Sequence, residues 1–313
     1  MNTLNIVEHM NSGPPGLLPP SDDDIDRLLL IRHFELSLLD LFAQGRLNGT
    51  THTCLGQEYI PVALYPLLDT EDFVFSNHRG HGHYLARFND PHGLLAEIMG
   101  REGAVCQGVG GSQHIFRDRY LSTGVQGQSL PVAAGVALHL KHFEPGRIAV
   151  VHIGDGTWGE GAVYEALNMA ALWRLPLLVV VENNGIAQST PTALEMAGTI
   201  GDRARAFGLP HHRTDSFDVV ALRRQLAAVV TEVRDRHRPQ VVEFVTHRVG
   251  PHSKGDDTRD AAELQRVQDR DWYGRYRSAF PDRFARADEA QRQLVADVTA
   301  EVDARPLSSW EER

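Results

Sequence analysis

Apolar side chains recur along this chain with the two spacings that distinguish helices from strands. Between residues 28 and 42 they are three or four residues apart: Leu28, Leu29, Ile31, Phe34, Leu38, Leu39 and Phe42. This spacing predicts a helix with one broad apolar face. Ser21 lies just before the helical pattern and is a suitable N-cap for it.

Predicted strands and helices alternate through the body of the chain. Short unbroken apolar runs predict buried strands at residues 73–75, 148–153, 177–181 and 241–245. Helical patterns occupy residues 94–99, 131–140, 161–173 and 219–236. This alternation indicates an α/β fold, in which a doubly wound, mostly parallel sheet carries helices on both faces.

The two ends of the chain differ from this body. Residues 1–20 contain the stretch SGPPGLLPP, and its prolines and glycines predict a disordered tail. Residues 21–260 are predicted to form the α/β domain. Residues 261–313 are rich in charge with a helical pattern, so we expect a peripheral C-terminal helical extension.

Composition excludes several classes of partner. The 313 residues carry a formal net charge of −10, which argues against nucleic acid or an anionic membrane, because both are bound by clusters of Lys and Arg. No apolar run approaches the roughly 20 residues that cross a bilayer. Cys54 and Cys106 are too few for a disulfide framework, and the first residues lack the pattern of a signal peptide. We therefore expect a cytoplasmic protein.

Two polar clusters follow neighbouring strands of the predicted sheet. Gly154-Asp155-Gly156 comes directly after one buried strand, and Asn183-Asn184 follows the next. Ligands of open parallel sheets bind outside the carboxyl ends of the strands, so we expect the two clusters to lie side by side. The glycines allow close backbone approach, and the following helix offers N–H groups to an anion. The sequence predicts an anion-binding site here.

Two kinds of anion compete for this site. Gly154-x-Gly156-x-x-Gly159 also fits the dinucleotide-binding pattern, with Glu182 as its ribose-binding acid. Asp155 would then lie against a pyrophosphate, and one like-charge pair about 4 Å apart costs about 4 kcal/mol at an effective dielectric of about 20. A divalent cation reverses that repulsion, and Mg²⁺ accepts oxygen ligands from a few protein groups and from phosphates. Electrostatics therefore favours a Mg²⁺-diphosphate.

Three further features have structural explanations. His78, His81 and His83 have the spacing H-x2-H-x-H, but no hydrolase-type set of Asp and His accompanies them, so we interpret them as polar loop residues rather than a metal cluster. Trp173 is expected in the core. Glu58 precedes the apolar run YIPVALYPLL and is expected to begin a helix and cap its backbone N–H groups.

Several motifs together resemble one family. GDG, 26 further residues and NN resemble the thiamine-diphosphate motif, and the stretch EALNMAALWRLPLLVVVENN resembles the α subunit of the E1 component of 2-oxo acid dehydrogenases, such as pyruvate or acetoin dehydrogenase. Four shorter segments resemble the same family: HTCLGQE at 52–58, SNHRGHG at 76–82, GVGGSQH at 108–114 and THRVGPHSKGDD at 246–257. The resemblance covers about residues 25 to 260 and implies the thiamine-diphosphate-binding fold.

The resemblance assigns a role to each matching residue. Asp155, Asn184 and the carbonyl of Ile186 would bind Mg²⁺. The residues implied in binding thiamine diphosphate are His78, Arg79, Gly124, Gln126, Gly154, Asp155, Gly156, Asn184 and Arg248. Among them, Arg79 and Arg248 would bind the diphosphate, for which guanidinium groups are well suited.

The catalytic residues implied by the resemblance are histidines. His252 would lie near the reacting carbon, with His52 as its neighbour. His78 stands where the family usually has a phosphate-contacting Tyr, and Ile186 stands where an aromatic residue is common. The change at His78 bears more on which substrate the enzyme takes than on which cofactor it binds.

The resemblance also implies an incomplete active site. Without the tail and the peripheral helices, about 230 residues remain, which is enough for one sheet domain of this kind and not for two. In the family the second domain belongs to a β subunit, which supplies an activating carboxylate in an α2β2 heterotetramer. The implied reaction is decarboxylation of a 2-oxo acid and transfer of the acyl unit to a lipoyl group on an E2 protein. A non-oxidative carboligase or transferase, and a non-catalytic paralogue, are the alternatives.

Overall fold

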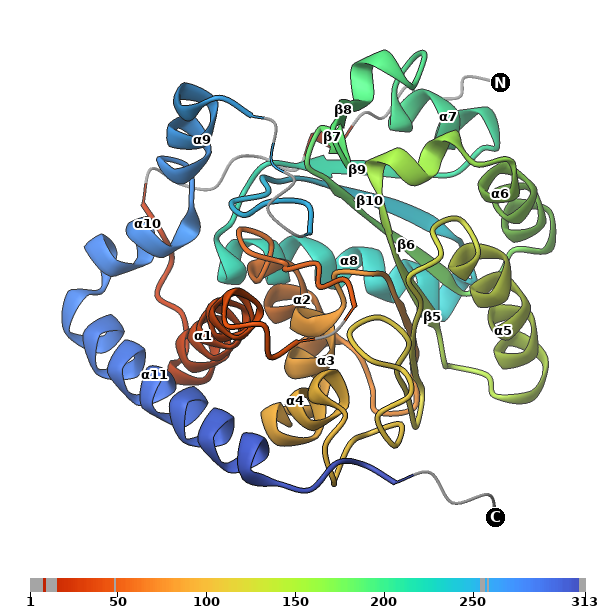
Figure 1. The fold of residues 1–313 in the computed structure, drawn as a ribbon. Coiled ribbons are helices and arrows are strands. Elements are labelled where there is room, and N and C mark those ends of the chain that lie inside the picture. The colour runs from red at the N-terminus through yellow and green to blue at the C-terminus, as the bar shows by residue number, and fades with distance from the viewer. Residues whose placement is uncertain (1–7, 10–15, 48, 254–256, 258, 310–313) are drawn as a thin grey trace.

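The computed structural model describes residues 8–9, 16–47, 49–253, 257 and 259–309, and one twisted sheet runs through the middle of them (Figure 1). The sheet has eight strands in the order β1-β9-β10-β6-β5-β2-β4-β3. Its strands are β1 (Glu8–His9), β2 (Phe73–Ser76), β3 (Phe116–Arg117), β4 (Tyr120–Ser122), β5 (Ala149–Gly154), β6 (Leu177–Asn183), β9 (His211–Thr214) and β10 (Gln240–Val245). A separate antiparallel pair joins β7 (Ile186–Ala187) to β8 (Thr190–Pro191). All pairs of the main sheet are parallel except β3 with β4.

Helices cover both faces of this sheet, which confirms the predicted α/β class. They are α1 (Asp22–Ala43), α2 (Tyr59–Leu64), α3 (His81–Phe88), α4 (Pro91–Met99), α5 (Ser129–Phe143), α6 (Gly161–Trp173), α7 (Ile200–Ala206), α8 (Val219–Arg236), α9 (Ala261–Gln268), α10 (Trp272–Ala279) and α11 (Pro281–Ala304). Short 3-10 turns occupy η1 (Tyr65–Leu67), η2 (Asp155–Gly159) and η3 (Thr192–Leu194).

The central strands are buried on both sides because their residues alternate between two apolar cores. Val150 and Val180 face the core that contains residues of α1, α2 and α8, whereas Val151, Val179 and Val181 face the core of α5 and α6. Strands buried on both faces read as unbroken apolar runs. This explains why the runs at 148–153 and 177–181 predicted strands correctly.

The N-terminal helix begins where its sequence predicts. The Ser21 hydroxyl accepts from the backbone N–H of Asp24, and the Asp24 carboxylate accepts from the backbone N–H of Ser21. This capping box satisfies N–H groups at the start of α1. Along its length α1 packs against α11, which curves around it (Figure 1).

Glu58 is not the helix cap that the sequence predicts. Its side chain makes no capping bond to α2. Instead, Arg32 Nε lies 2.6 Å from Glu58 Oε1, and Trp272 Nε1 donates to Oε2 at 2.7 Å. Arg32 also makes two hydrogen bonds to Asp271. Glu58 therefore joins the N-terminal helix to the C-terminal helices inside the protein.

The two predicted end segments are more closely packed than expected. Glu8 and His9 pair in parallel with His212 and Arg213, and the N–H of Leu18 donates to Asp218 at 2.8 Å. Residues 8–9 and 16–20 therefore make defined contacts, whereas residues 1–7 and 10–15 lie outside the described residues. The predicted disorder of residues 1–20 stays a prediction. The extension from 261 is helical as predicted, and it adds buried side chains to the larger core: Trp272, Tyr276, Phe284, Val295, Val298 and Val302.

Two further expectations concern the surface. Trp173 is 41 % exposed at the end of α6, so its placement in the core is wrong. Among the described helices, none combines the length and the apolar character needed to cross a bilayer.

Candidate active site

A cavity of about 390 Å³ opens where the parallel strands end, within the usual size range of small-molecule sites. The loops after β2, β4, β5 and β6 supply its walls. Nearly all of the predicted site residues line it: His52, His78, Arg79, Gly124, Gln126, Gly154, Asp155, Gly156, Asn184, Ile186 and His252. Arg248 lies beside it, with Nη1 3.4 Å from Nδ1 of His252. The predicted residues therefore lie together around one cavity, and their individual roles stay predictions.

Sheet register brings the two halves of the metal motif together. β5 and β6 pair in parallel with Gly154 opposite Glu182, so Asp155 and Asn184 emerge at the same edge. The N–H of Asn184 donates to Asp155 Oδ1 at 3.3 Å, and the N–H of Ile186 donates to Asn184 Oδ1 at 3.2 Å. The hydroxyl of Thr192 donates to the other oxygen of Asp155. The loops after β5 and β6 thus bring together oxygen atoms of the kind that the predicted Mg²⁺ site needs.

Asp155 has the environment of a carboxylate that needs a cation. It is 2 % exposed, and within the described part of the chain it forms no ion pair. Burial raises the pKa of its carboxyl above the usual value, although hydrogen bonds from Thr192 and nearby backbone N–H groups oppose the rise. A buried carboxylate without a positive partner is costly, and a bound Mg²⁺ would remove that cost.

The dinucleotide alternative does not match the geometry. The chain after β5 forms the 3-10 turn η2 before α6 begins at Gly161, so the helix does not start inside the glycine pattern. Glu182 is buried with its oxygens occupied: His83 Nε2 lies 2.7 Å from Oε1, and Asn77 Nδ2 donates to Oε2 at 3.0 Å. Because both Glu182 oxygens already have hydrogen-bond partners inside the protein, this residue does not fit the role of a ribose-binding acid.

Two buried guanidinium groups make the neighbouring wall of the cavity positive. Arg79 is 4 % exposed and Arg248 is 2 % exposed. Burial, together with the charge of Arg248, lowers the pKa of Arg79 to about 10. Two like charges brought together out of water are stabilised by an anion between them, and guanidinium groups match phosphate oxygens.

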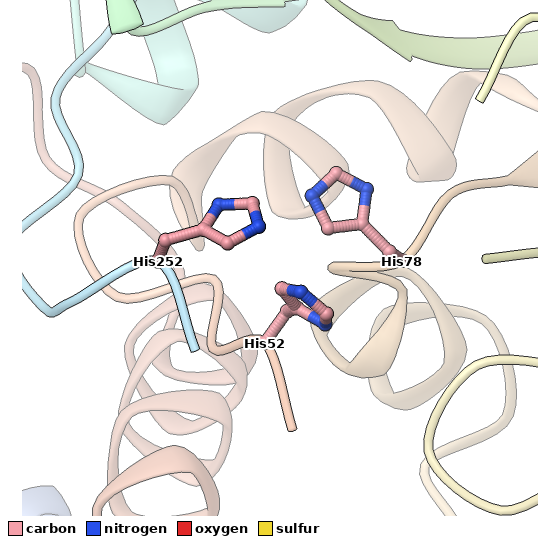
Figure 2. Close-up of side chains that lie close together, drawn as sticks. All are labelled: His52, His78 and His252. Atoms are coloured by element: carbon pink, nitrogen blue, oxygen red, sulfur yellow. The ribbon is translucent and has the colours of Figure 1, made fainter. Parts of the chain in front are cut away.

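The histidines of the sequence separate into different environments. His52 and His252 are neighbours as predicted, with ring centroids 4.7 Å apart, and His78 lies 4.8 Å from His52 (Figure 2). His81 turns away to Glu35, and His83 turns to Ser76 and Glu182. The H-x2-H-x-H spacing therefore forms no shared metal cluster.

Several supporting residues escaped sequence reasoning. The side chain of Gln126 joins His78 Nδ1, at 2.8 Å, to the hydroxyl of Thr157, at 3.2 Å. The side-chain nitrogen of Gln113 forms a hydrogen bond with His52 Nδ1 at 3.1 Å. Arg259 donates to the carbonyls of Arg248 and Gly250 and so fixes the segment that carries His252. A glutamine or arginine in a loop carries no sequence signal for such roles.

The glycine-rich loop before β3 is held from two sides. Buried Glu97 accepts backbone N–H bonds from Cys106, Gly108, Gly110 and Gly111, at 2.6 to 3.2 Å. From the other side, Ser308 N donates to Gly100 O at 2.8 Å and Ser308 Oγ donates to Gln107 O at 2.6 Å. We call residues 305–308 the C-terminal strap. The loop leads directly to Gln113, so both supports act on the position of His52.

Comparisons with known proteins show the family of this chain. The family model described as "Dehydrogenase E1 component" matches residues 26–307. The chain is 35 % identical over 246 residues to the alpha subunit of acetoin:2,6-dichlorophenolindophenol oxidoreductase of Bacillus subtilis, covering 77 % of this chain and 74 % of the relative. It is 37 % identical over 238 residues to the pyruvate dehydrogenase E1 component subunit alpha of Zymomonas mobilis, covering 74 % of this chain and 67 % of the relative.

A third relative matches over a longer range. The pyruvate dehydrogenase E1 component subunit alpha of Rhizobium meliloti is 32 % identical over 299 residues, 88 % of this chain and 84 % of the relative. The family match spans both the sheet edge that carries the cavity and the C-terminal helices. The chain therefore belongs to the dehydrogenase E1 component family, the thiamine-diphosphate-dependent components of 2-oxo acid dehydrogenases.

Proposed function

We propose that this chain is the α subunit of a two-chain enzyme that decarboxylates a 2-oxo acid and passes the acyl unit to a lipoyl group on an E2 protein. Asp155, Asn184 and the carbonyl of Ile186 hold Mg²⁺, and Arg79 and Arg248 hold the diphosphate of the cofactor. When bound, thiamine diphosphate supplies the carbanion chemistry that cleaves the bond to the carboxylate. The cytoplasm is the proposed location, in keeping with two free cysteines.

One observation carries the cofactor assignment. Asp155 is a buried carboxylate with no positive partner among the described residues, and it shares a cavity with Arg79. The pKa of the Arg79 guanidinium is lowered by burial and by a second guanidinium. A divalent cation satisfies the first group and a diphosphate satisfies the second. The two ligands also bind each other, since Mg²⁺ is commonly held by carboxylates together with phosphate oxygens.

The protein's part in the reaction follows from the histidines. His52 and His252 line the cavity next to Arg79, whose Nη2 lies 3.1 Å from His252 Nδ1. They can orient the oxo group of the substrate and donate a proton to its oxygen as negative charge develops there. The guanidinium beside His252 holds its ring in place.

A β-like partner chain supplies the missing carboxylate. Glu58, the internal candidate, is fully buried in its ion pair with Arg32 and does not reach the cavity. A docking surface for the partner is supported by a second cavity of about 330 Å³ beside α5, lined by the exposed apolar residues Phe116 and Val132. This surface continues to Val125, which is 46 % exposed, next to the cavity residues Gly124 and Gln126. We expect an α2β2 heterotetramer.

The test combines assembly with activity. The chain is purified alone and with a β-type partner, and each preparation is assayed with a panel of 2-oxo acids and an artificial electron acceptor, with and without thiamine diphosphate and Mg²⁺. Turnover is expected only from the pair with both cofactors. Glu160 is a second carboxylate of this chain, and it lines the cavity. Turnover by the chain alone, lost in Glu58→Gln or in Glu160→Gln, would overturn the half-site proposal. A pair that binds cofactor by calorimetry but turns over no 2-oxo acid would overturn the proposed reaction.

A further inference from the structure

Two buried glutamates stand on neighbouring parallel strands behind the cavity. Glu182 belongs to β6 and is 3 % exposed, and Glu243 belongs to the adjacent strand β10 and is 4 % exposed (Figure 1). The register places Glu182 opposite Phe244, the residue after Glu243. Since successive side chains of a strand point to opposite faces, the two carboxylates leave the sheet on opposite sides.

A buried histidine holds one oxygen of each carboxylate. His83 Nε2 lies 2.7 Å from Glu182 Oε1, and His211 Nε2 lies 2.8 Å from Glu243 Oε2. An ionised carboxylate can only accept, so the ring nitrogen donates in both contacts. The second oxygen of each glutamate remains for another donor.

That donor is an asparagine amide in both cases. Asn77 Nδ2 donates to Glu182 Oε2 at 3.0 Å, and Asn183 Nδ2 donates to Glu243 Oε1 at 2.8 Å. Because the glutamate can only accept, each amide must turn its nitrogen toward the carboxylate and its oxygen away from it. We call Asn77 with Glu182 the first pair and Asn183 with Glu243 the second pair.

Each oriented amide oxygen holds the backbone two residues farther along the chain. Asn77 Oδ1 accepts from the N–H of Arg79 at 2.8 Å, and Asn183 Oδ1 accepts from the N–H of Gly185 at 3.1 Å. A reversed amide would put its NH₂ group against that backbone N–H and its oxygen against the carboxylate, so the asparagine would lose both hydrogen bonds. The glutamates therefore fix the two turns that these asparagines begin.

The two turns carry groups that the proposed function assigns to the cofactor. The first contains Arg79, which is proposed to bind the diphosphate. The second contains Gly185, which stands between the proposed metal ligands Asn184 and Ile186. A misplacement of about 1 Å at such groups can lower a rate about 100-fold, so the shape of each turn matters for function.

We propose that Glu182 and Glu243 are positioning residues, which orient Asn77 and Asn183 so that the two turns have the shape needed to bind the diphosphate and Mg²⁺. The inference rests on the proposed function and adds the residues that shape its site. In the second pair the action is indirect, because neither Asn183 nor Glu243 is among the described residues that line the cavity. The competing explanation is that the glutamates only stabilise the fold.

The test exchanges donor and acceptor within a pair. In Asn77→Asp the new carboxylate faces that of Glu182. In Glu182→Gln two donors, Asn77 Nδ2 and His83 Nε2, face a side chain with only one oxygen. The double variant restores both contacts, because the new amide nitrogen donates to the new aspartate and the new amide oxygen accepts from His83. Asn183→Asp and Glu243→Gln make the same exchange in the second pair.

The first readout is the dissociation constant of thiamine diphosphate, measured by calorimetry on the assembled enzyme with saturating Mg²⁺. Each single variant of the first pair should weaken binding at least about fivefold, and the double variant should return to within about threefold of the wild type. The second pair should show the same pattern in the Mg²⁺ concentration needed for half-saturation. Gln293→Glu is the matched control, because it breaks an exposed amide–carboxylate pair with Asp297, and it should have no effect.

The second readout needs no cofactor. Hydrogen exchange of the assembled enzyme is followed by mass spectrometry in peptides covering residues 77–82 and 183–188. Each single variant should speed exchange in the peptide of its own pair and not in the other, and the double variant should restore the wild-type rate. A purely structural role predicts a lower thermal midpoint without this local pattern.

Three results would overturn the inference. One is a double variant that binds cofactor no better than its single variants. Another is a Glu182→Gln enzyme that binds cofactor more tightly by the factor that Asn77→Asp loses, because simple addition of charges would then explain both. The third is unchanged exchange in both peptides. The full pattern in an enzyme that binds thiamine diphosphate but turns over no 2-oxo acid would support the inference and reject the proposed reaction.

Discussion

Replacing Asp155 by asparagine should affect the stability of the folded chain and its affinity for the cofactor in opposite directions. The substitution keeps the shape of the side chain and one oxygen ligand but removes the charge. In the chain without cofactor this relieves a buried carboxylate that is 2 % exposed and has no positive partner among the described residues. The one remaining oxygen can accept from the Asn184 N–H, and the Thr192 hydroxyl, which can rotate, can accept from the new amide. We therefore expect the thermal midpoint of the cofactor-free chain to stay unchanged or to rise.

The effect on cofactor binding should have the opposite sign. One unit charge interacts with another about 4 Å away by roughly 4 kcal/mol at an effective dielectric of about 20. If desolvation of the ions cancels half of this, about 2 kcal/mol remains, which corresponds to a roughly 30-fold weaker affinity. Asp155→Asn should show at least that loss, and Asp155→Ala, which also removes the oxygen ligand, should abolish Mg²⁺-dependent binding.

Calorimetric titration of thiamine diphosphate, with and without Mg²⁺, measures this effect in the assembled enzyme. Asp202→Asn provides a matched control, because Asp202 is an exposed aspartate at the start of α7 and does not line the cavity. An Asp155→Asn enzyme that binds cofactor within about threefold of the wild type would refute the metal assignment.

Three other predictions concern stability. Asp72 is fully buried and makes two hydrogen bonds to Arg234. Asp72→Ala leaves Arg234 only its ion pair with Asp69 at 3.2 Å and removes the acceptor of the Ile148 N–H. The substitution should therefore lower the free energy of unfolding by about 3 kcal/mol in urea titrations, and a loss under about 1 kcal/mol would contradict this. Gly56 has a φ of +92°, and an added Cβ would lie 2.4 Å from the carbonyl oxygen of His247. Gly56→Ala should therefore lower the free energy of unfolding by at least about 2 kcal/mol. A variant with the Tm of the wild type would count against this prediction. Burial, aided by His83, lowers the pKa of His152 to about 4. Between pH about 6.5 and 4 the unfolded chain therefore binds more protons than the folded chain. As the pH is lowered through this window, the free energy of unfolding should fall by up to about 3 kcal/mol. His152→Gln should flatten this dependence and His92→Gln should not, as urea unfolding at several pH values would show.

The parts of the site that follow strands could be predicted from the sequence. Asp155 and Asn184 come directly after apolar runs, and parallel strands bring their carboxyl ends to one edge. Local periodicity therefore placed them together without knowledge of the fold. The same reasoning gave the bounds of α6 and α8 as they stand in the structure.

The residues that the sequence misplaced depend on distant partners. Glu58 stands before a helix, and its local sequence indicates a cap, but its partners Arg32 and Trp272 are 26 and 214 residues away. Glu97 reads as an ordinary helix residue, yet its carboxylate gathers the N–H groups of a whole loop. Trp173 follows an apolar pattern to the last residue of α6, where the helix leaves the core. Tertiary contacts decided each case.

The C-terminal strap has a consequence for how the enzyme is made. Ser308 and its partner Gln107 are separated by 201 residues, and a ribosome that adds about 5 to 20 residues per second needs roughly 10 to 40 s to cover that distance. During this interval Glu97 alone can hold the glycine-rich loop of the nascent chain. The loop gains its second support only after α11 has been synthesised and has folded back along α1 and α4. Readiness to bind cofactor is therefore expected to be one of the last events in biosynthesis, after the sheet has formed.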